Sequence, residues 1–315
     1  MHVGADERRY TIAFANLTEE PGVTLEGTGF TGREVRESFV LAARRLPVEL
    51  VLYDNRRDPK IARDNAADAA RRKVDLFVEY FDEPTANQAI ARTLHEARIP
   101  VLAISHPVGD APLYTADNVA AGRLAGEALA DFAARSWSGR AVVALIVGPV
   151  GARHDRLPER VQGITEGLRR RQPALRIATL DTQGNPATVG GLVGKAVAAQ
   201  PGAKFLVAAL DDATALAAKS ALESAGRLAD GAIVGQGCDR TVHGGASDRK
   251  EIDPNNRGSI VLGSVAFFLD RYGYEVLPLA LRVLRGERVP ARTPTSHLLI
   301  TAANVFREYP PYDMQ

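Results

Sequence analysis

Residues 76–104 read LFVEYFDEPTANQAIARTLHEARIPVLAI. Two short apolar runs, Leu76–Tyr80 and Val101–Ile104, have the length of buried strands and flank a stretch with helical spacing. A helix is predicted over Ala86–Ala97, with Thr85 as its N-cap and Pro100 three residues beyond its end. A strand, a helix and a second strand in this order are typical of a parallel sheet covered by helices.

The same alternation continues along the whole chain. Strands are also predicted at Thr11–Asn16 and Glu49–Tyr53, with a helix at Gly32–Arg45. After Asn118 the plan of the first half starts again. The predicted helices there are Val119–Ala134, Leu157–Arg171, Pro186–Ala199, Asp212–Ala225 and Gly273–Arg285, and the predicted strands are Ala141–Val147, Ile177–Leu180, Phe205–Ala209, Ala232–Gly235, Ser259–Gly263 and Thr295–Ile300. We predict an α/β fold with two doubly wound parallel-sheet lobes.

Length and charge agree with this fold and argue against one class of partner. A chain of 315 residues is long enough for two domains, and 45% hydrophobic residues supply two cores. The formal net charge is only +1, so no broad positive field is available for nucleic acid, and no nucleic-acid partner is expected. The basic runs fall at predicted helix ends, where cations offset the helix dipole: Arg44–Arg45, Arg56–Arg57, Arg71–Arg72 and Arg169–Arg171.

The compartment stays open at this stage. Cys238 is the single cysteine, so the chain cannot form an internal disulfide, and its redox environment is not defined. Residues 1–9 are polar where a signal peptide would carry its apolar stretch. We expect either a cytosolic protein or a mature form from which a leader was removed.

A glycine pattern near the N-terminus suggests a nucleotide enzyme as an alternative. Residues 27–32 read GTGFTG, the spacing of a dinucleotide fingerprint, and Asp54 follows where an acid that binds ribose would fall. In that fingerprint, however, the first glycine turns directly off the strand, whereas here residues 17–26 intervene. A flexible loop leading into the helix at Gly32–Arg45 is the preferred interpretation.

Other catalytic and metal patterns are weak. Cys238 with Asp239 and His243 is compatible with a thiol nucleophile, but a cysteine just after an apolar strand is more often a small buried hydrophobe. The six histidines show no paired metal-ligand spacing, and neither a serine elbow nor a phosphate loop is present. We expect no catalysis, no metal and no cofactor.

Polar side chains instead gather where predicted strands end. In open α/β sheets, ligands bind just outside the carboxyl ends of the strands. Carboxylates accept pairs of hydrogen bonds and guanidinium groups donate them, so such groups suit a sugar or other polyol. The residues at these ends are Asn16, Thr18, Glu19, Asp82, Glu83, Ser105, His106, Asp211, Asp212 and Asp239.

The order of segments resembles the type I periplasmic binding proteins, which share a fold with the effector cores of LacI-type repressors. The most specific stretches are IPVLAIS at 99–105, TADNVAAGRLAG at 115–126, RVQGI at 160–164 and the predicted helix end at 281–286 before Pro290. The resemblance implies three crossovers between the lobes, with Asp117, Asn118, Gly263 and Thr293 as hinge residues. It also implies lobes of 1–116 with 263–293 and of 117–262 with 294–315.

The resemblance further implies ligand contacts. Sugar-binding members commonly carry Asp-Arg after the fourth strand, where this chain has Ser105–His106. Arg156 or Arg160 takes the place of the ligand-binding arginine. Asp211 falls near the family's Asn-Asp pair, with Leu210 at the Asn position, and Asp239 falls near its Gly-x-Asp site. Phe30 or Phe81 replaces the aromatic residues that stack on a sugar ring.

The expected function is therefore that of a non-catalytic receptor. Its lobes close on a sugar or polyol in the cleft between them, and a membrane permease of an ABC importer reads the closed form. A periplasmic location goes with this function. The alternatives are the effector domain of a cytoplasmic LacI-type regulator without its DNA-binding headpiece, and a nucleotide-dependent oxidoreductase.

Overall fold

The computed structural model describes residues 8–151, 156–244 and 250–310, which form two compact units. Of the described residues, the first unit contains 8–23, Phe30–Ala116 and Leu269–Thr295. The second contains Thr24–Gly29 and the described residues of 117–268 and 296–310. The chain therefore passes between the units several times, and residues 24–29 are an excursion from the first unit into the second.

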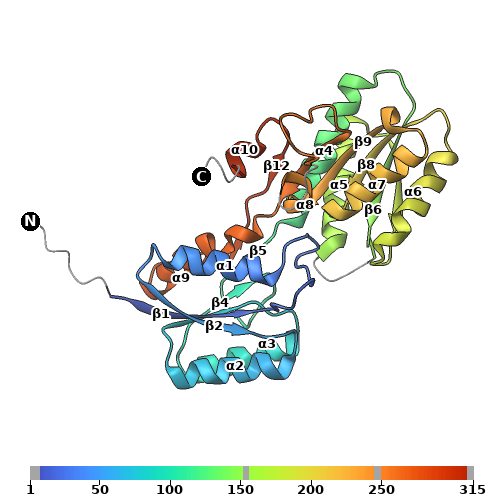
Figure 1. Ribbon diagram of the computed structural model, residues 1–315. Helices are drawn as coiled ribbons and strands as arrows, with labels where there is room; N and C mark the ends of the chain where they lie inside the picture. Colours follow the sequence, from blue (N-terminus) through green and yellow to red (C-terminus); the bar gives the residue numbers. More distant parts are fainter. Residues whose placement is uncertain (1–7, 152–155, 245–249, 311–315) are drawn as a thin grey trace, which may run out of the picture. The chain divides into compact units, whose positions relative to one another are not determined.

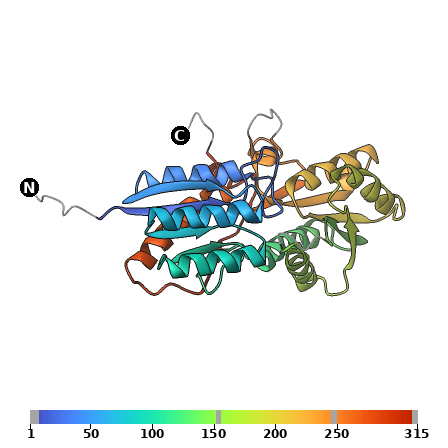
Figure 2. The ribbon, with the colours of Figure 1, turned by 90° about the horizontal axis from the view of Figure 1, so that it is seen from below.

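The first unit is built on a six-stranded parallel sheet with the order β11-β5-β4-β3-β1-β2. Helices α2 and α3 cover one face, and α1 and α9 cover the other (Figure 1). Figure 2 shows α2 and α3 side by side along the sheet. The strands are β1 Tyr10–Asn16, β2 Val48–Asp54, β3 Leu76–Glu79, β4 Val101–Ile104, β5 Leu113–Thr115 and β11 Arg292–Pro294, and the helices are α1 Gly32–Ala43, α2 Pro59–Arg72, α3 Pro84–Glu96 and α9 Tyr272–Leu284.

The second unit repeats this architecture with the sheet order β12-β10-β9-β8-β6-β7, in which only β12 runs antiparallel to its neighbour. Helices α4 and α5 pack against each other, as do α6 and α7. The strands are β6 Val142–Gly148, β7 Arg176–Asp181, β8 Lys204–Ala209, β9 Gly231–Gly237, β10 Val261–Ala266 and β12 Leu298–Ile300, and the helices are α4 Asn118–Ser136, α5 Leu157–Arg171, α6 Val189–Ala198, α7 Asp212–Ser224, α8 Arg240–His243 and α10 Val305–Glu308.

Both cores follow from strands that are buried on both faces. In the first unit the rings of Phe14 on β1 and Phe39 on α1 stack with their centroids 3.9 Å apart. The central strand β8 of the second unit, Phe205 to Ala209, is fully buried. Continuous apolar strands of this kind are typical of parallel sheets that helices cover on both sides.

Helices α4 and α5 approach at backbone distance because glycines face each other. A Cβ added to Gly163 would lie 2.0 Å from the carbonyl oxygen of Val119, and one added to Gly126 would lie 2.3 Å from that of Ile164. No larger residue fits at these two positions without moving a helix. The close contact fixes the position of α5, whose first turn carries Arg160.

The predicted fold class is confirmed, and some element ends are corrected. Helix α3 begins two residues earlier than predicted, because Glu83 rather than Thr85 is its N-cap and accepts hydrogen bonds from the N–H groups of Thr85 and Ala86. The helix predicted at 186–199 is a 3-10 turn followed by α6. The strand predicted at 295–300 is only Leu298–Ile300, since the chain pairs with β5 of the first sheet up to Pro294.

The two units differ from the predicted lobes in three places. Residues 263–268 lie in the second unit because β10 pairs with both β9 and β12. The last passage falls after Thr295, and residues 24–29 join the second unit. Among the described residues, no helix has both the length and the apolar character needed to cross a membrane.

Candidate functional site

The predicted residues at the end of β1 hold the start of α1 in place. Asn16 is fully buried, and its Nδ2 donates to the carbonyl of Gly32 at 2.8 Å. Thr18 is also buried, and its hydroxyl accepts from the N–H of Glu20. A Cβ on Gly32 would lie 1.6 Å from the carbonyl oxygen of Thr18, which explains the glycine there. Both predicted residues serve the local structure.

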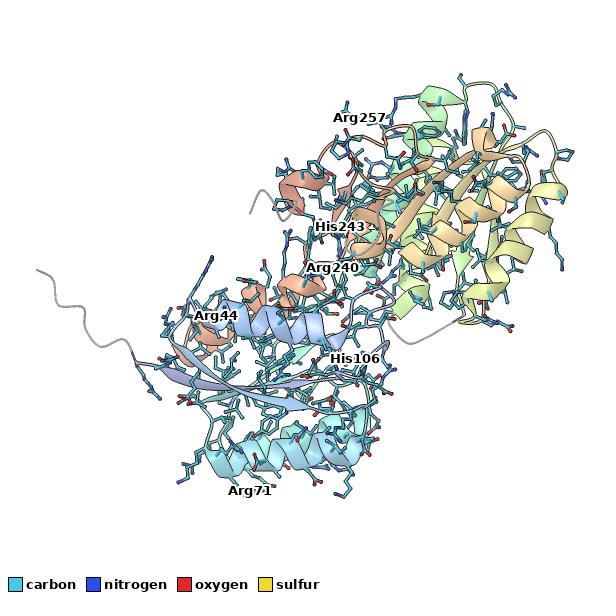
Figure 3. All side chains as sticks on the ribbon, viewed as in Figure 1. Arg44, Arg71, His106, Arg240, His243 and Arg257 are labelled. Carbon is cyan, nitrogen blue, oxygen red and sulfur yellow. The ribbon has the colours of Figure 1, made fainter. Side chains whose placement is uncertain are left out.

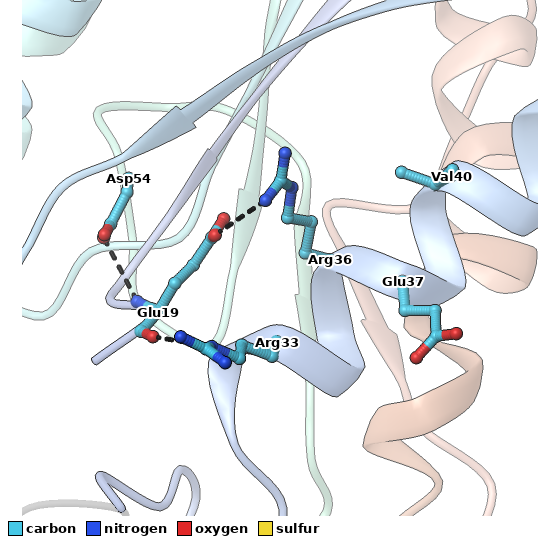
Figure 4. Close-up of a pocket in the computed structure, with 6 residues that line it drawn as sticks. All are labelled: Glu19, Arg33, Arg36, Glu37, Val40 and Asp54. Carbon is cyan, nitrogen blue, oxygen red and sulfur yellow. Dashed lines mark hydrogen bonds and ion pairs between the residues drawn. The ribbon is translucent and has the colours of Figure 1, made fainter. Parts of the chain in front are cut away.

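The predicted residue Glu19 lines a cavity of about 550 Å³ in the first unit (Figure 4). Its carboxylate pairs with Arg36 at 3.0 Å, and its N–H donates to Asp54 at 3.2 Å. Arg33 donates to the carbonyl of Glu19. Carboxylate acceptors and guanidinium donors thus both line this hollow.

The polar residues after β3 and β4 include the N-cap of α3, Glu83, and a turn at Ser105 with a strained backbone. Asp82 lies 3.5 Å from Arg57, and both side chains are partly exposed. Ser105 has a φ of +63°, is buried, and donates its N–H to the carbonyl of Tyr114 at 2.7 Å. The side chain of His106, labelled in Figure 3, is partly exposed. Of this group, Asp82 and His106 are therefore open to a ligand.

The aromatic candidates, by contrast, are buried. Phe30 is 2% exposed and Phe81 is 1% exposed. Phe30 lies just before α1, Phe81 lies just after β3, and both belong to the first unit. The predicted stacking of either ring on a sugar stays a prediction.

Arg160 is the most completely bonded of the predicted ligand residues. It is fully buried, and its Nε donates to the side-chain oxygen of Asn118 at 3.0 Å. Nη1 donates to the carbonyls of Leu210 and Gly27 at 2.6 and 2.9 Å, and Nη2 donates to the carbonyl of Glu26 at 2.8 Å. The guanidinium also stacks over the ring of Phe267, with Cζ 4.3 Å from its centroid. Its acceptors are thus groups of the chain itself.

Asp239 lies at the end of β9 and begins helix α8. Its Oδ1 accepts from the N–H and the hydroxyl of Thr241 at 2.8 and 2.6 Å, and only 4% of the residue is exposed. Its own N–H donates to Asp212 at 2.9 Å. The position of Asp239 just after a strand is predictable from the sequence, whereas its burial is not.

Asp212 is a fully buried acid beside Asp239. Burial raises the pKa of its carboxyl well above the usual value, and the nearby Asp239 carboxylate raises it further. Hydrogen bonds from Ser264 and from the Asp239 N–H act in the opposite direction. The buried carboxyl therefore favours its protonated form.

Two further predicted residues are partly exposed and have local roles. Asp211 caps α7, accepting from the N–H of Thr214 at 2.6 Å and from its hydroxyl at 3.0 Å. Arg156 precedes α5 and pairs with Glu159 one turn later. Both keep exposed surface, so neither role prevents contact with a ligand.

Three of the four predicted hinge residues lie in regular structure, and Asp117 immediately precedes it. Asp117 caps α4 and Asn118 is its first residue, while Thr293 lies in β11 of the first unit. Gly263 lies inside β10, where an added Cβ would sit 2.3 Å from the carbonyl oxygen of Ile300. The chain leaves the second unit only after Phe268.

His297, which the sequence pattern does not mark as a site residue, contacts the chain near Asp117 and Ala266. The N–H of Asp117 donates to Nε2 of His297 at 3.1 Å, and Nδ1 of His297 lies 3.1 Å from the carbonyl oxygen of Ala266. Because a carbonyl only accepts, Nδ1 carries the proton and donates it. One neutral ring thus links the segment from Ser296 onward to both ends of the segment Asp117–Phe268 of the second unit. Nothing in the spacing of the histidines indicates this role.

The enzyme alternatives find no geometric support. Cys238 is buried, with a φ of +54°, and its N–H donates to the hydroxyl of Ser264. His243 stacks on the ring of Tyr309, with centroids 4.0 Å apart. Residues 27–29 of the loop predicted to be flexible belong to the second unit, where the carbonyl of Gly27 accepts a hydrogen bond from Arg160. Within the described part of the chain, no cluster of three His, Cys, Asp or Glu residues is arranged to hold a metal ion.

Two units built on six-stranded, mostly parallel sheets, with polar groups at the strand ends, define the fold of two-lobed binding proteins. The chain belongs to the family described as periplasmic binding protein domain, which matches residues 22–287. A comparison with curated proteins finds no match.

Several solved structures share the fold. A Mycobacterium smegmatis protein in complex with β-D-fucofuranose is 21% identical, with a TM-score of 0.70, over 97% of this chain and 95% of that one. An ABC transporter periplasmic solute-binding protein from Actinobacillus succinogenes with bound D-allose is 14% identical, with a TM-score of 0.70, over 96% and 100%. One from Agrobacterium vitis with bound allitol is 17% identical, with a TM-score of 0.68, over 96% and 98%.

Proposed function

We propose that the chain is a substrate-binding receptor of an ABC-type importer and that its ligand is a sugar or related polyol. The observation that carries this proposal is the family match over residues 22–287. It is supported by structures of the same fold that are described with β-D-fucofuranose, D-allose or allitol bound. The receptor works in the periplasm, delivers its ligand to a membrane permease, and performs no chemistry of its own.

The proposed ligand contacts are the predicted polar residues that keep exposed surface. Their carboxylate, imidazole and guanidinium groups supply both acceptors and donors for hydroxyl pairs. These residues are Glu19, Asp82, His106, Arg156 and Asp211. The burial of Asn16, Thr18 and Ser105 favours a supporting role for them.

A thermal-shift screen of refolded, ligand-free protein tests the proposal. The panel contains D-allose, allitol, myo-inositol, sugar acids, nucleosides and nicotinamide dinucleotides. A ligand at 100 times its Kd adds about 2.7 kcal/mol to the free energy of unfolding, which raises the melting temperature measurably. A shift with a sugar or polyol supports the receptor. A shift with dinucleotides alone contradicts it.

A pair of matched variants then tests the site. Asp211→Asn keeps an N-cap side chain but removes a charge, and it is expected to lower the affinity for the ligand about 10-fold or more. Asp58→Asn makes the same change at the N-cap of α2 and is expected to leave the affinity unchanged. Equal affinity of both variants contradicts the assignment of Asp211.

A further inference from the structure

Arg160 uses its hydrogen-bonding capacity on the protein itself. A guanidinium has five N–H donors in a rigid plane. Four hydrogen bonds run from Arg160 to Asn118, Leu210, Gly27 and Glu26, and the face of the group lies over Phe267. Three of the four acceptors are backbone carbonyls. An arginine that is fully buried and bonded in this way is already occupied before a ligand arrives.

Two of those carbonyls belong to the segment Thr24–Gly29, which we term the inserted segment. Glu26 and Gly27 both have positive φ, at +56° and +59°, and their consecutive carbonyls both accept from Arg160. The turn is closed by the N–H and the hydroxyl of Thr28, which donate to the carbonyl of Leu25 at 2.9 and 2.8 Å. Leu25, Glu26 and Thr28 are buried. The inserted segment is therefore an ordered part of the second unit.

The same segment covers Asp239. A Cβ added to Gly29 would lie only 1.8 Å from Oδ2 of Asp239 and 2.4 Å from its Cγ. The Asp239 side chain is held in place because its Oδ1 accepts two hydrogen bonds from Thr241. A side chain at position 29 thus requires the segment to move. Glycine at this position permits the backbone to lie directly on the carboxylate.

We propose that Arg160 is a positioning residue that binds the inserted segment, and that this segment is the fixed wall of the binding surface over Asp239. The proposal rests on the proposed receptor function and narrows it. The ligand contacts the surface that the inserted segment leaves open, and Arg160 keeps its bonds to Glu26 and Gly27 when the ligand binds. Selectivity then depends on the shape of a backbone turn rather than on the charge of an arginine.

Amide hydrogen exchange of the full chain tests the positioning role without a ligand. The wild-type Thr28 amide is expected to exchange slowly. In Arg160→Lys a single ammonium replaces the planar guanidinium. Amide exchange in residues 24–29 is then expected to be about 10-fold faster, while amide exchange in β8 and β9 stays the same. Gly29→Ala is expected to give the same local loss with Arg160 intact. Gly202→Ala, where a Cβ meets nothing within 4 Å, is the matched control and should match the wild type.

Two outcomes overturn the proposal. One is unprotected exchange of residues 24–29 in the wild type. The other is protection that neither Arg160→Lys nor Gly29→Ala reduces, which removes Arg160 as the positioning group. If Arg160→Lys fails to fold, Gly29→Ala against Gly202→Ala still decides the question.

A second exchange measurement, with saturating D-allose or allitol, separates this proposal from the receptor function. Unchanged or stronger protection of residues 24–29 supports a fixed wall. Faster exchange on binding means that the ligand displaces the segment and takes Arg160, and this overturns the proposal. If neither compound binds, the result counts against the proposed ligand class, and the ligand-free comparison alone decides the role of Arg160.

Discussion

Two completely buried side chains of opposite charge type, Glu79 in the first unit and Arg160 in the second, have different surroundings. In the first unit, Glu79 on β3 accepts one hydrogen bond, from Nδ2 of Asn55 at 2.7 Å. Burial raises the pKa of Glu79 well above its usual value, and the bond from Asn55 offsets this only in part. In the second unit, four oxygen atoms surround the guanidinium of Arg160.

The difference follows from what each group can do with its charge. A buried carboxyl takes up a proton and becomes neutral, so one partner suffices. A guanidinium stays protonated at any ordinary pH, so a buried one requires an oxygen for nearly every donor. Those oxygens come from the inserted segment, from α4 and from the end of β8. The second unit therefore depends on the accurate placement of several elements around one side chain.

The largest expected effect comes from displacing the helix that carries Arg160. In Gly163→Ala the added Cβ overlaps the carbonyl of Val119, so α5 must move away from α4, and the four bonds of Arg160 are strained together. We expect a loss of about 1–3 kcal/mol in the free energy of unfolding, measured with urea.

The matched control for this change is Gly194→Ala in the middle of α6, where a Cβ meets nothing within 4 Å. There the gain in helix propensity is expected to add about 0.5–1 kcal/mol. If both variants shift the unfolding midpoint equally, the close α4–α5 contact is not what positions Arg160.

The sequence predicts the helix that carries Arg160 but not the partners of Arg160. The bounds of α5, Leu157 to Arg171, and of β4, Val101 to Ile104, are predicted to the residue, because apolar periodicity and flanking turn residues determine them. The three-residue strands β5 and β11 are not predicted, since three residues carry no periodicity.

The candidate site is harder to predict for a physical reason. The acceptors of Arg160 are mainly backbone carbonyls, and every residue has one, so no residue type marks them. The glycines at 27 and 29 do carry a signal, but it equally fits a phosphate-binding loop. The ten residues between β1 and Gly27 argue against the phosphate-binding loop, and the distance from Gly29 to Asp239 shows what the glycine does instead. Strand-end acids are predictable by position, whereas their burial depends on what the rest of the chain lays over them.

A second prediction concerns the histidine next to the ring that stacks under Arg160. The ring of His297 contacts Phe267 edge-on at 4.6 Å, and burial lowers the pKa of His297, with Arg160 lowering it and Asp117 and the carbonyl of Ala266 raising it. Because the folded state binds this proton less readily than the unfolded state, its contribution to stability is complete above about pH 6.5 and falls as the pH falls.

The matched comparison is His297→Gln, which keeps a donor and an acceptor but does not titrate. Between pH 6.5 and 5 the wild type is expected to lose up to about 1.4 kcal/mol per pH unit relative to the variant. His243, whose pKa burial lowers to about 4, is present in both proteins and cancels. Urea unfolding at each pH measures the difference. If the stabilities of the two proteins depend on pH in the same way, the fold does not lower the pKa of His297.

The smallest effect tests the neutral carboxyl of the first unit. Glu79→Gln replaces a protonated acid by a neutral amide of the same shape, so at pH 4 the stability is expected to change by less than about 1 kcal/mol. Because the folded pKa is raised, the stability from protonated Glu79 is present below its unfolded pKa, near 4.5, and is lost as the pH rises through the folded value. The free energy of unfolding of the variant, relative to that of the wild type, should therefore increase as the pH rises.

Glu83→Gln in the same unit gives the opposite sign and serves as the control. Hydrogen bonds from the N–H groups of Thr85 and Ala86 lower the pKa of Glu83, so its stabilising effect is present above its unfolded pKa and shrinks as the pH falls. The stability differences of the two variants from the wild type should thus change in opposite directions with pH. If both change in the same direction, Glu79 is ionised inside the first unit, and a buried carboxylate there would need as many partners as Arg160 has in the second.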